Sequence, residues 1–236
     1  KLRIKMKNLK YKSKRYKDLI KSHKDETLNA IDAIKLLKKN KTVKFKESID
    51  VHFNLNVEKA KADQTLRTTV DLPNGNGKKN KIAVICSNDK VNDAKKAGAD
   101  IVGSDDLVEK ISGGKIDFDI LVCSPDMMSK VGKLGKILGP KGLMPNPKFG
   151  TVSQNVGKAV KDLKEGKVEI RCDVDGNLSL SIGRIDFDEK KILENLKTVY
   201  ETVDKEKPTG IKGNFINSIY LTSTMGLSNK ISIKSL

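Results

Sequence analysis

The chain has 236 residues, a length that suits one large domain or two of ordinary size. Lysine and arginine number 47 against 30 acidic residues, which gives a formal net charge of +17. An enzyme that acts on neutral metabolites needs no such excess. A protein that binds a polyanion does, because each neutralised phosphate releases counterions.

The charge is unevenly distributed along the chain. Residues 1–75 carry 20 basic and 9 acidic side chains, residues 76–166 carry 16 and 11, and residues 167–236 carry 11 and 10. The excess therefore lies mainly in the N-terminal part, which favours nucleic acid as the partner. An anionic membrane is the alternative, but no basic amphipathic helix with a bulky aromatic face is evident.

Cysteine usage argues against a disulfide framework or a zinc site. Cys86, Cys123 and Cys172 are isolated in apolar or alternating runs, with no C-x-x-C spacing. We expect buried thiols in a reducing compartment, with no metal and no cofactor. No apolar run approaches membrane-spanning length, and no signal-peptide pattern opens the sequence.

The first quarter of the chain predicts a helical arm, a helix and an alternating strand. The first 24 residues hold 11 basic side chains and one acid, and apolar residues within them indicate that part of the arm docks as a helix. Residues 27–39 predict a second helix, with these residues facing inward: Ala30, Ile31, Ile34 and Leu37. A strand follows whose inward face holds Ile49, Val51, Phe53, Leu55 and Val57. His52 then lies on the polar face, where no partner acid or cysteine stands at catalytic spacing.

The middle of the chain changes rhythm after a breaker cluster at residues 72–78. Apolar strands at residues 82–86 and 119–123 alternate with helices near residues 89–97 and after Ser104, a plausible N-cap. Such alternation indicates a parallel sheet with both faces covered. A further helix over residues 156–165 ends at Gly166.

The last part returns to alternating strands. Strands are predicted at residues 168–172, 178–182 and 215–224, and a long helix follows Asp188. The economical fold is a two-layer α+β domain formed by residues 1–74 and 167–236, with a Rossmann-like α/β domain of residues 75–166 inserted into it. Asn74, Gly75 and Gly166 lie at the two crossings, where we expect a hinge.

An alternative function is a nucleotide-dependent α/β enzyme, but the motifs for one are missing. No glycine-lysine pair has the spacing of a P-loop, and the first turn of the predicted α/β domain contains no glycine. The paired carboxylates Asp105-Asp106 and Asp117-Asp119 stand where acids commonly cap helices or end strands. His23 and His52 are far apart in the sequence.

Two segments suit nucleic acid. Lys44-Phe45 precedes the first alternating strand, and Thr222 to Gly226 follows the last one. Hydroxyls and amides can contact 2′-hydroxyls and phosphates, while Phe or Met can stack on bases. The alternative is that Phe45 belongs to the core and the hydroxyl run is an ordinary edge strand. These two interpretations are evenly balanced at this point.

Residues 132–147 read G-K-L-G-K-I-L-G-P-K-G-L-M-P-N-P, a composition that predicts a shaped loop rather than a regular helix or strand. Extended to Gly150, this segment resembles the signature of the ribosomal protein L-one family, the side-stalk proteins of the large ribosomal subunit. Residues 62–78, residues 97–103 and Thr224-Met225-Gly226 match the same family in the same order. The resemblance covers residues 14–231.

The resemblance implies a two-domain, non-enzymatic protein of the large subunit. It implies binding of large-subunit (23S) rRNA at the mobile side stalk and assistance in releasing deacylated tRNA from the exit site. It also implies repression of translation of the protein's own operon through its mRNA. The expected location is the ribosome in the cytoplasm, with an organellar ribosome left open.

The resemblance also assigns RNA-contacting positions, chiefly in the discontinuous domain. These are Lys14, Arg15, Lys44, Phe45, Ser48, Ser218, Thr224, Met225 and Gly226. The glycine-rich segment is assigned to domain architecture, with a weaker role toward RNA. The chain departs from the family at Leu227, where proline is common, and at Lys46 and Ser48, where an acid and a threonine are common.

Overall fold

The computed structural model describes residues 12–22, 26–57, 66–87, 90–208, 211 and 213–236. The chain divides into two compact units. The split unit comprises Lys1–Arg67, Leu72–Asn76 and Ile170–Leu236, and the inserted unit comprises Thr68–Asp71 and Gly77–Glu169. Residues 68–71 and 167–169, assigned to the outer domain from the sequence, cluster with the inserted unit because their strands pair with each other.

The split unit is built on a four-stranded sheet in the order β7-β1-β8-β9. Its strands are β1 (Ser48–Leu55), β7 (Asn177–Arg184), β8 (Ile216–Ser223) and β9 (Asn229–Ile231). Every pairing is antiparallel, and β1 lies in the middle with β7 and β8 on either side. β9 was missed in the sequence because three residues are too short to show an alternating pattern.

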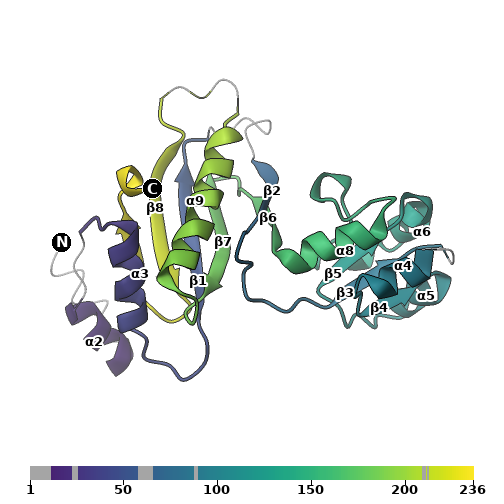
Figure 1. The fold of residues 1–236 in the computed structure, drawn as a ribbon, viewed down its shortest axis with the longest axis horizontal. Helices are drawn as coiled ribbons and strands as arrows, with labels where there is room; N and C mark the ends of the chain where they lie inside the picture. Colours follow the sequence, from purple (N-terminus) through teal and green to yellow (C-terminus); the bar gives the residue numbers. More distant parts are fainter. Residues whose placement is uncertain (1–11, 23–25, 58–65, 88–89, 209–210, 212) are drawn as a thin grey trace. The chain divides into compact units, whose positions relative to one another are not determined.

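Helices cover one face of this sheet. α3 (Ala30–Lys39) and α9 (Glu189–Lys205) lie side by side against it, as Figure 1 shows, and α2 (Lys14–Ser22) is the helix predicted in the basic arm. The alternation in β1 is confirmed, since Ile49, Val51, Phe53 and Leu55 are all buried. The predicted inward residues of α9 are buried as well: Ile192, Leu196, Val199 and Val203.

Two residues of this unit, Ile31 and Val57, were wrongly predicted to be buried. Ile31 is 46% exposed, and Ala33 is buried instead. Ala33 shares a helix face with Ala30, Ile34 and Leu37, whereas Ile31 is turned away from that face. Val57 lies beyond the end of β1 and is only partly buried.

The inserted unit contains the predicted parallel sheet, in the order β4-β3-β5. β3 (Ile82–Ile85), β4 (Ile101–Gly103) and β5 (Ile120–Cys123) are short; β3 and β5 are largely buried and β4 is partly buried. Two apolar clusters fill the two sides of the sheet. α4 (Val91–Lys96) and α8 (Val156–Glu165) cover one side, and α5 (Asp105–Ser112) covers the other. Ser104 is the N-cap of α5, although its side chain makes no capping hydrogen bond.

The glycine-rich segment is more regular than its composition predicts. After the 3-10 turn η3 (Pro125–Met127), the helix α6 (Met128–Gly132) runs into the segment, and α7 (Gly135–Leu138) is a single helical turn within it. The segment was predicted to be a shaped loop rather than a regular helix or strand, yet it contains this helical turn, because Leu134 and Leu138 pack into the core and hold it. Residues 139–146 remain irregular before the 3-10 turn η4 (Pro147–Phe149). A two-stranded ribbon of β2 (Arg67–Asp71) and β6 (Lys167–Arg171) completes the elements.

Candidate nucleic-acid interface

The start of β1 and the end of β8 lie side by side at one end of the strands of the split unit, and this end is called the edge of the sheet below. The backbone N–H of Ser48 donates to Thr224 Oγ1 at 3.0 Å, and the N–H of Thr224 donates to the Ser48 carbonyl at 3.2 Å. These residues are 176 positions apart in the sequence. The fold thus places the Thr-Met-Gly turn beside the Lys44-Phe45 loop.

A buried carboxylate holds the next residue of the turn. Glu47 is 1% exposed, and its Oε1 accepts a hydrogen bond from the Met225 backbone N–H at 3.2 Å. The Gly226 N–H donates to the Ser223 carbonyl at 3.1 Å, which closes the turn. A Cβ at Gly226 would lie 2.4 Å from Ser223 Oγ, so any larger residue in this position would require the Ser223 side chain to move.

The basic arm reaches the same turn. Arg15, on α2, donates from Nη1 to the Met225 carbonyl at 2.7 Å and to Thr42 Oγ1 at 3.2 Å. Its neighbour Lys14 is exposed. Since Glu47 and Arg15 bind the N–H and the carbonyl of one residue, Met225 is fixed at both ends of its backbone.

The apolar side chains at this edge face solvent. Phe45 is 51% exposed and Met225 is 39% exposed, and Lys44 beside them is also exposed. Phe45 is therefore not a core residue, and the alternative interpretation that placed it in the core was wrong. Lys46 pairs with Asp186 at 2.8 Å and, by this hydrogen bond, lowers the pKa of that carboxyl.

Ser218 is not part of this group. It lies on β8 six residues before Thr224, a distance of about 20 Å along a strand. It faces the partly exposed polar side of the sheet, opposite Asn54 of β1. β8 is an inner strand at residues 219–221, where it pairs with both β1 and β9, whereas Thr222 and Ser223 pair with β1 alone.

The residues predicted as hinge points have different surroundings. In the split unit, the Asn74 N–H donates to Asn195 Oδ1 at 3.1 Å, and Asn195 Nδ2 donates to the Gly75 carbonyl at 2.9 Å. Asn195 is fully buried, so residues 74–75 are anchored to α9. Gly166, in the inserted unit, ends α8 with φ +126°.

The other titratable residues do not assemble into a catalytic group. His52 Nδ1 lies 2.8 Å from Ser179 Oγ, Asp105 pairs with Lys130, and Asp119 accepts from the Lys81 N–H. His23 lies outside the described residues. Among the residues that the structure describes, no cluster of histidine, cysteine and acidic side chains has the makings of a metal site. Within the same residues, no helix has the length and apolar character to cross a membrane.

Comparison with known proteins decides the family. The model of the "Ribosomal protein L1p/L10e family" matches residues 37–227. The chain is 49% identical over 224 residues to the "Large ribosomal subunit protein uL1" of Prochlorococcus marinus subsp. pastoris, covering 95% of both chains. The protein of the same name from a Synechococcus species is 47% identical over the same share.

The chain belongs to the ribosomal protein L1p/L10e family. The match runs through Lys44, Phe45 and the Thr-Met-Gly turn, so this part of the surface lies within the family region, while Lys14 and Arg15 precede it. The related proteins of this family are ribosomal proteins rather than enzymes, and this chain is not an enzyme.

The sequence did not predict two further residues that contribute to this surface, Glu47 and Arg184. Arg184, at the end of β7, donates from Nη1 to the Lys46 carbonyl at 3.2 Å and to Ser48 Oγ at 3.3 Å. Glu47 carried a weak signal, since it directly follows residues 35–46, which contain lysines and no acid. Arg184 carried none, because only the pairing of β1 with β7 brings it to this edge.

Proposed function

We propose that this chain is a constituent of the large ribosomal subunit and binds its rRNA through the edge of the split unit. The binding surface, here called the RNA edge, consists of Lys14, Arg15, Lys44, Phe45, Ser48, Thr224, Met225 and Gly226. The related proteins are named as large-subunit proteins and match nearly the whole chain, which supports membership of the subunit.

The observation that carries the proposal is the double hydrogen bond between Ser48 and Thr224. It joins two segments that are distant in sequence into one surface with a fixed backbone. The three backbone N–H groups of the Thr-Met-Gly turn and the Met225 carbonyl are already bound within the protein, so the turn is ordered before RNA arrives. Pre-ordering lowers the entropy cost of binding.

The chemistry of the RNA edge suits structured RNA. Exposed lysines neutralise phosphates, and the Thr224 hydroxyl can contact a ribose 2′-hydroxyl. Phe45 and Met225 present exposed apolar surface on which a base or ribose can stack. Ser218 belongs to the proposal as a peripheral contact on the polar face of the sheet.

The finer functions rest on the family resemblance. We assign the rRNA-binding site to the side stalk of 23S rRNA. We also assign to the protein a role in the release of deacylated tRNA from the exit site. Repression of the chain's own operon uses the same RNA edge, since an mRNA that mimics the rRNA site meets the same side chains. The protein then acts on the ribosome in the cytoplasm or in an organelle.

The proposed architecture is a discontinuous RNA-binding domain of residues 1–74 and 167–236 with an inserted domain between two hinge points. Gly75 and Gly166 have positive φ values of +63° and +126°. This backbone conformation favours glycine and occurs at both points where the chain passes between the two proposed domains. NMR relaxation and small-angle scattering, with and without RNA, test the hinge. An interdomain orientation that stays rigid in both states rules it out.

The binding proposal is tested with a stalk fragment of large-subunit rRNA. About six to ten phosphate contacts predict a loss of roughly 10³–10⁵ in affinity between about 50 and 200 mM salt. Cosedimentation with large subunits tests membership independently. An RNA complex insensitive to salt, or a chain that never sediments with the subunit, contradicts the proposal.

A further inference from the structure

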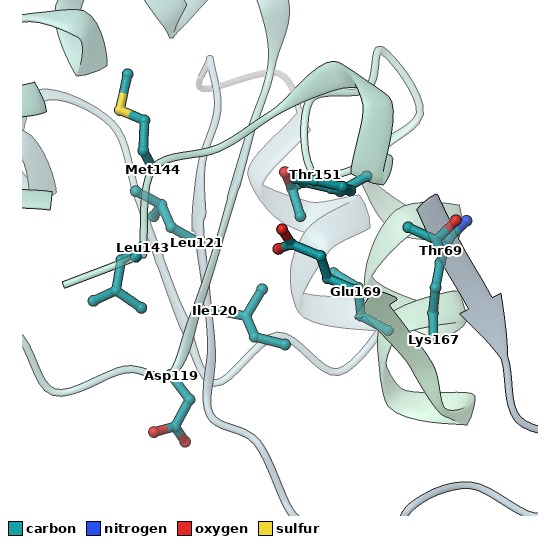
Figure 2. A pocket seen from close by; sticks show the side chains of 12 residues that line it. Thr69, Asp119, Ile120, Leu121, Leu143, Met144, Thr151, Lys167 and Glu169 are labelled. Atoms are coloured by element: carbon teal, nitrogen blue, oxygen red, sulfur yellow. The ribbon is translucent and has the colours of Figure 1, made fainter. Parts of the chain in front are cut away.

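The inserted unit contains a pocket that the RNA edge does not use. It has a volume of about 200 Å³ and lies among β5, the β2–β6 ribbon and the glycine-rich segment. Figure 2 shows Leu143 and Met144 on one side, Lys167 and Glu169 on the other, and Ile120 between them. All of its lining residues belong to the inserted unit.

The walls of the pocket are apolar and partly open to solvent. Ile120, Leu143, Met144 and Phe149 are only half-buried, and the first three pack against the core of the unit. The volume is smaller than the roughly 300–1,000 Å³ of sites for drug-sized ligands. A single flat ring system therefore suits the pocket better than a whole nucleotide or a peptide segment.

Two of the charged side chains that line the pocket are unpaired. Among the described residues, the side chains of Lys167 and Glu169 make no hydrogen bond or ion pair, although they are two residues apart on the same strand. Lys167 Nζ lies 3.6 Å from the position of a Cβ on Gly150, which places the ammonium beside that glycine, at the end of the lining segment. Asp119 is already bound to the Lys81 N–H and turns away from the pocket in Figure 2.

The segment that forms one wall of the pocket is rich in lysine. Residues 127–161 contain seven lysines and no acid, although the lining itself also includes Asp119 and Glu169. Lys141 and Lys148, which flank the lining residues Gly142 and Phe149, are both exposed. An apolar slot with cations around its entrance matches an unpaired base followed by its phosphates, because stacking and phosphate neutralisation act together in single-strand binding.

We propose that this pocket binds an unpaired guanine of an RNA strand. Guanine offers two N–H donors on one edge beside a carbonyl oxygen. Glu169 accepts from the donors and Lys167 donates to the carbonyl, while Met144 and Phe149 contact the faces of the ring. The pocket is a second RNA site, distinct from the RNA edge, and the proposal stands whether or not that edge binds rRNA.

The test uses the full chain with methyl-labelled methionine, leucine and isoleucine, and guanosine monophosphate as the probe. We expect millimolar guanosine monophosphate to shift the NMR signals of Met144, Leu143 and Ile120 and to leave that of Met225 unchanged. Adenosine monophosphate is expected to bind at least about tenfold more weakly, because a good bidentate base contact discriminates by about this factor or more. Inorganic phosphate is the control for simple anion binding.

The variant Glu169→Gln is exposed and should fold normally. We expect it to lose the preference for guanine while its affinity for the stalk fragment of rRNA stays unchanged. Glu165→Gln, an exposed acid on α8, is the matched control and should keep the preference. Absence of methyl shifts, identical shifts with phosphate, or a guanine preference that survives Glu169→Gln would overturn the proposal.

Discussion

The hydroxyl of Thr224 accepts a hydrogen bond from the backbone of Ser48, and the backbone of Thr224 returns one to the same residue. Through this exchange the last residue before Met225 is tied to the first residue of β1. The RNA edge therefore does not depend on the exposed loops alone, since its turn is anchored on the central strand of the sheet.

Thr224→Val removes the hydroxyl and keeps the shape of the side chain. The Ser48 N–H loses its acceptor, which costs about 0.5–1.5 kcal/mol, and we expect rRNA-fragment affinity to fall roughly fivefold. Fluorescence anisotropy at fixed salt measures the change. Thr222→Val, two residues earlier on β8, is the control, because its hydroxyl bonds only to the neighbouring Ser223 carbonyl. Equal effects of the two changes would count against the anchoring role.

Phe45→Ala tests stacking on RNA. Base–aromatic stacking contributes about 1–3 kcal/mol, so affinity should fall by that amount. The free energy of unfolding should change little, because the ring is 51% exposed. Ile31→Ala removes an apolar side chain of similar exposure, 46%, from α3 and should leave RNA affinity unchanged. Unaltered binding in the folded Phe45→Ala variant would reject this role.

Glu47→Ala should lower RNA affinity by loosening the Met225 backbone. The lost hydrogen bond costs about 1 kcal/mol, which is roughly a fivefold change. Glu47→Gln keeps an oxygen that can accept from the Met225 N–H and should restore most of the affinity. Rescue by glutamine distinguishes a positioning contact from a charge effect. If glutamine is no better than alanine, the carboxylate charge matters rather than the hydrogen bond.

Asn195→Ala should destabilise the split unit by about 2–4 kcal/mol, because buried backbone groups lose their partners. Asn195 Nδ2 donates to the Gly75 and Ile182 carbonyls at 2.9 and 2.7 Å, and its Oδ1 accepts from Asn74. Urea denaturation measures the loss, and hydrogen exchange at residues 74–75 should accelerate. Lys197→Ala, exposed on the same helix, is expected to change stability by less than about 0.5 kcal/mol.

The thiol of Cys123 should be unreactive in the folded protein. Burial raises its pKa to about 11, with Cys86 and Asp126 nearby adding to the effect, and the thiolate is the reactive form. Alkylation at pH 8 should require unfolding, whereas a thiol introduced by Ser228→Cys at an exposed site should react at once. Rapid labelling of native Cys123 would show that the site opens locally.

The raised pKa of Cys123 also predicts how the free energy of unfolding changes with pH. The folded thiol keeps its proton above the ordinary pKa of 9.0, where the unfolded thiol loses it. Its contribution to stability is therefore fully present below about pH 9 and decreases as the pH rises toward about 11. Cys123→Ala should flatten this part of the stability profile, measured by urea denaturation at several pH values.

Patterns with a strong period were predictable from the sequence. The alternation of β1 and the four buried positions of α9 were confirmed because a half-buried strand and an amphipathic helix each impose their own repeat. Ile31 was wrongly predicted to be buried, because one extra apolar residue next to the buried face of a helix leaves the helical repeat of apolar residues intact. The glycine-rich segment was misjudged since Leu134 and Leu138 stabilise a helical turn that composition alone disfavours.

The sequence by itself identified the family and predicted the class of partner, because the glycine-proline motif is specific in order and charge is additive along the chain. It also named Lys44, Phe45 and the Thr-Met-Gly triplet as separate segments. Only the tertiary structure decided that Glu47, Arg15 and Arg184 surround them, that Phe45 faces solvent, and that Ser218 lies apart. The physical reason is that strand pairing joins residues by register in space, and register between β1, β7 and β8 leaves no local trace in the chain.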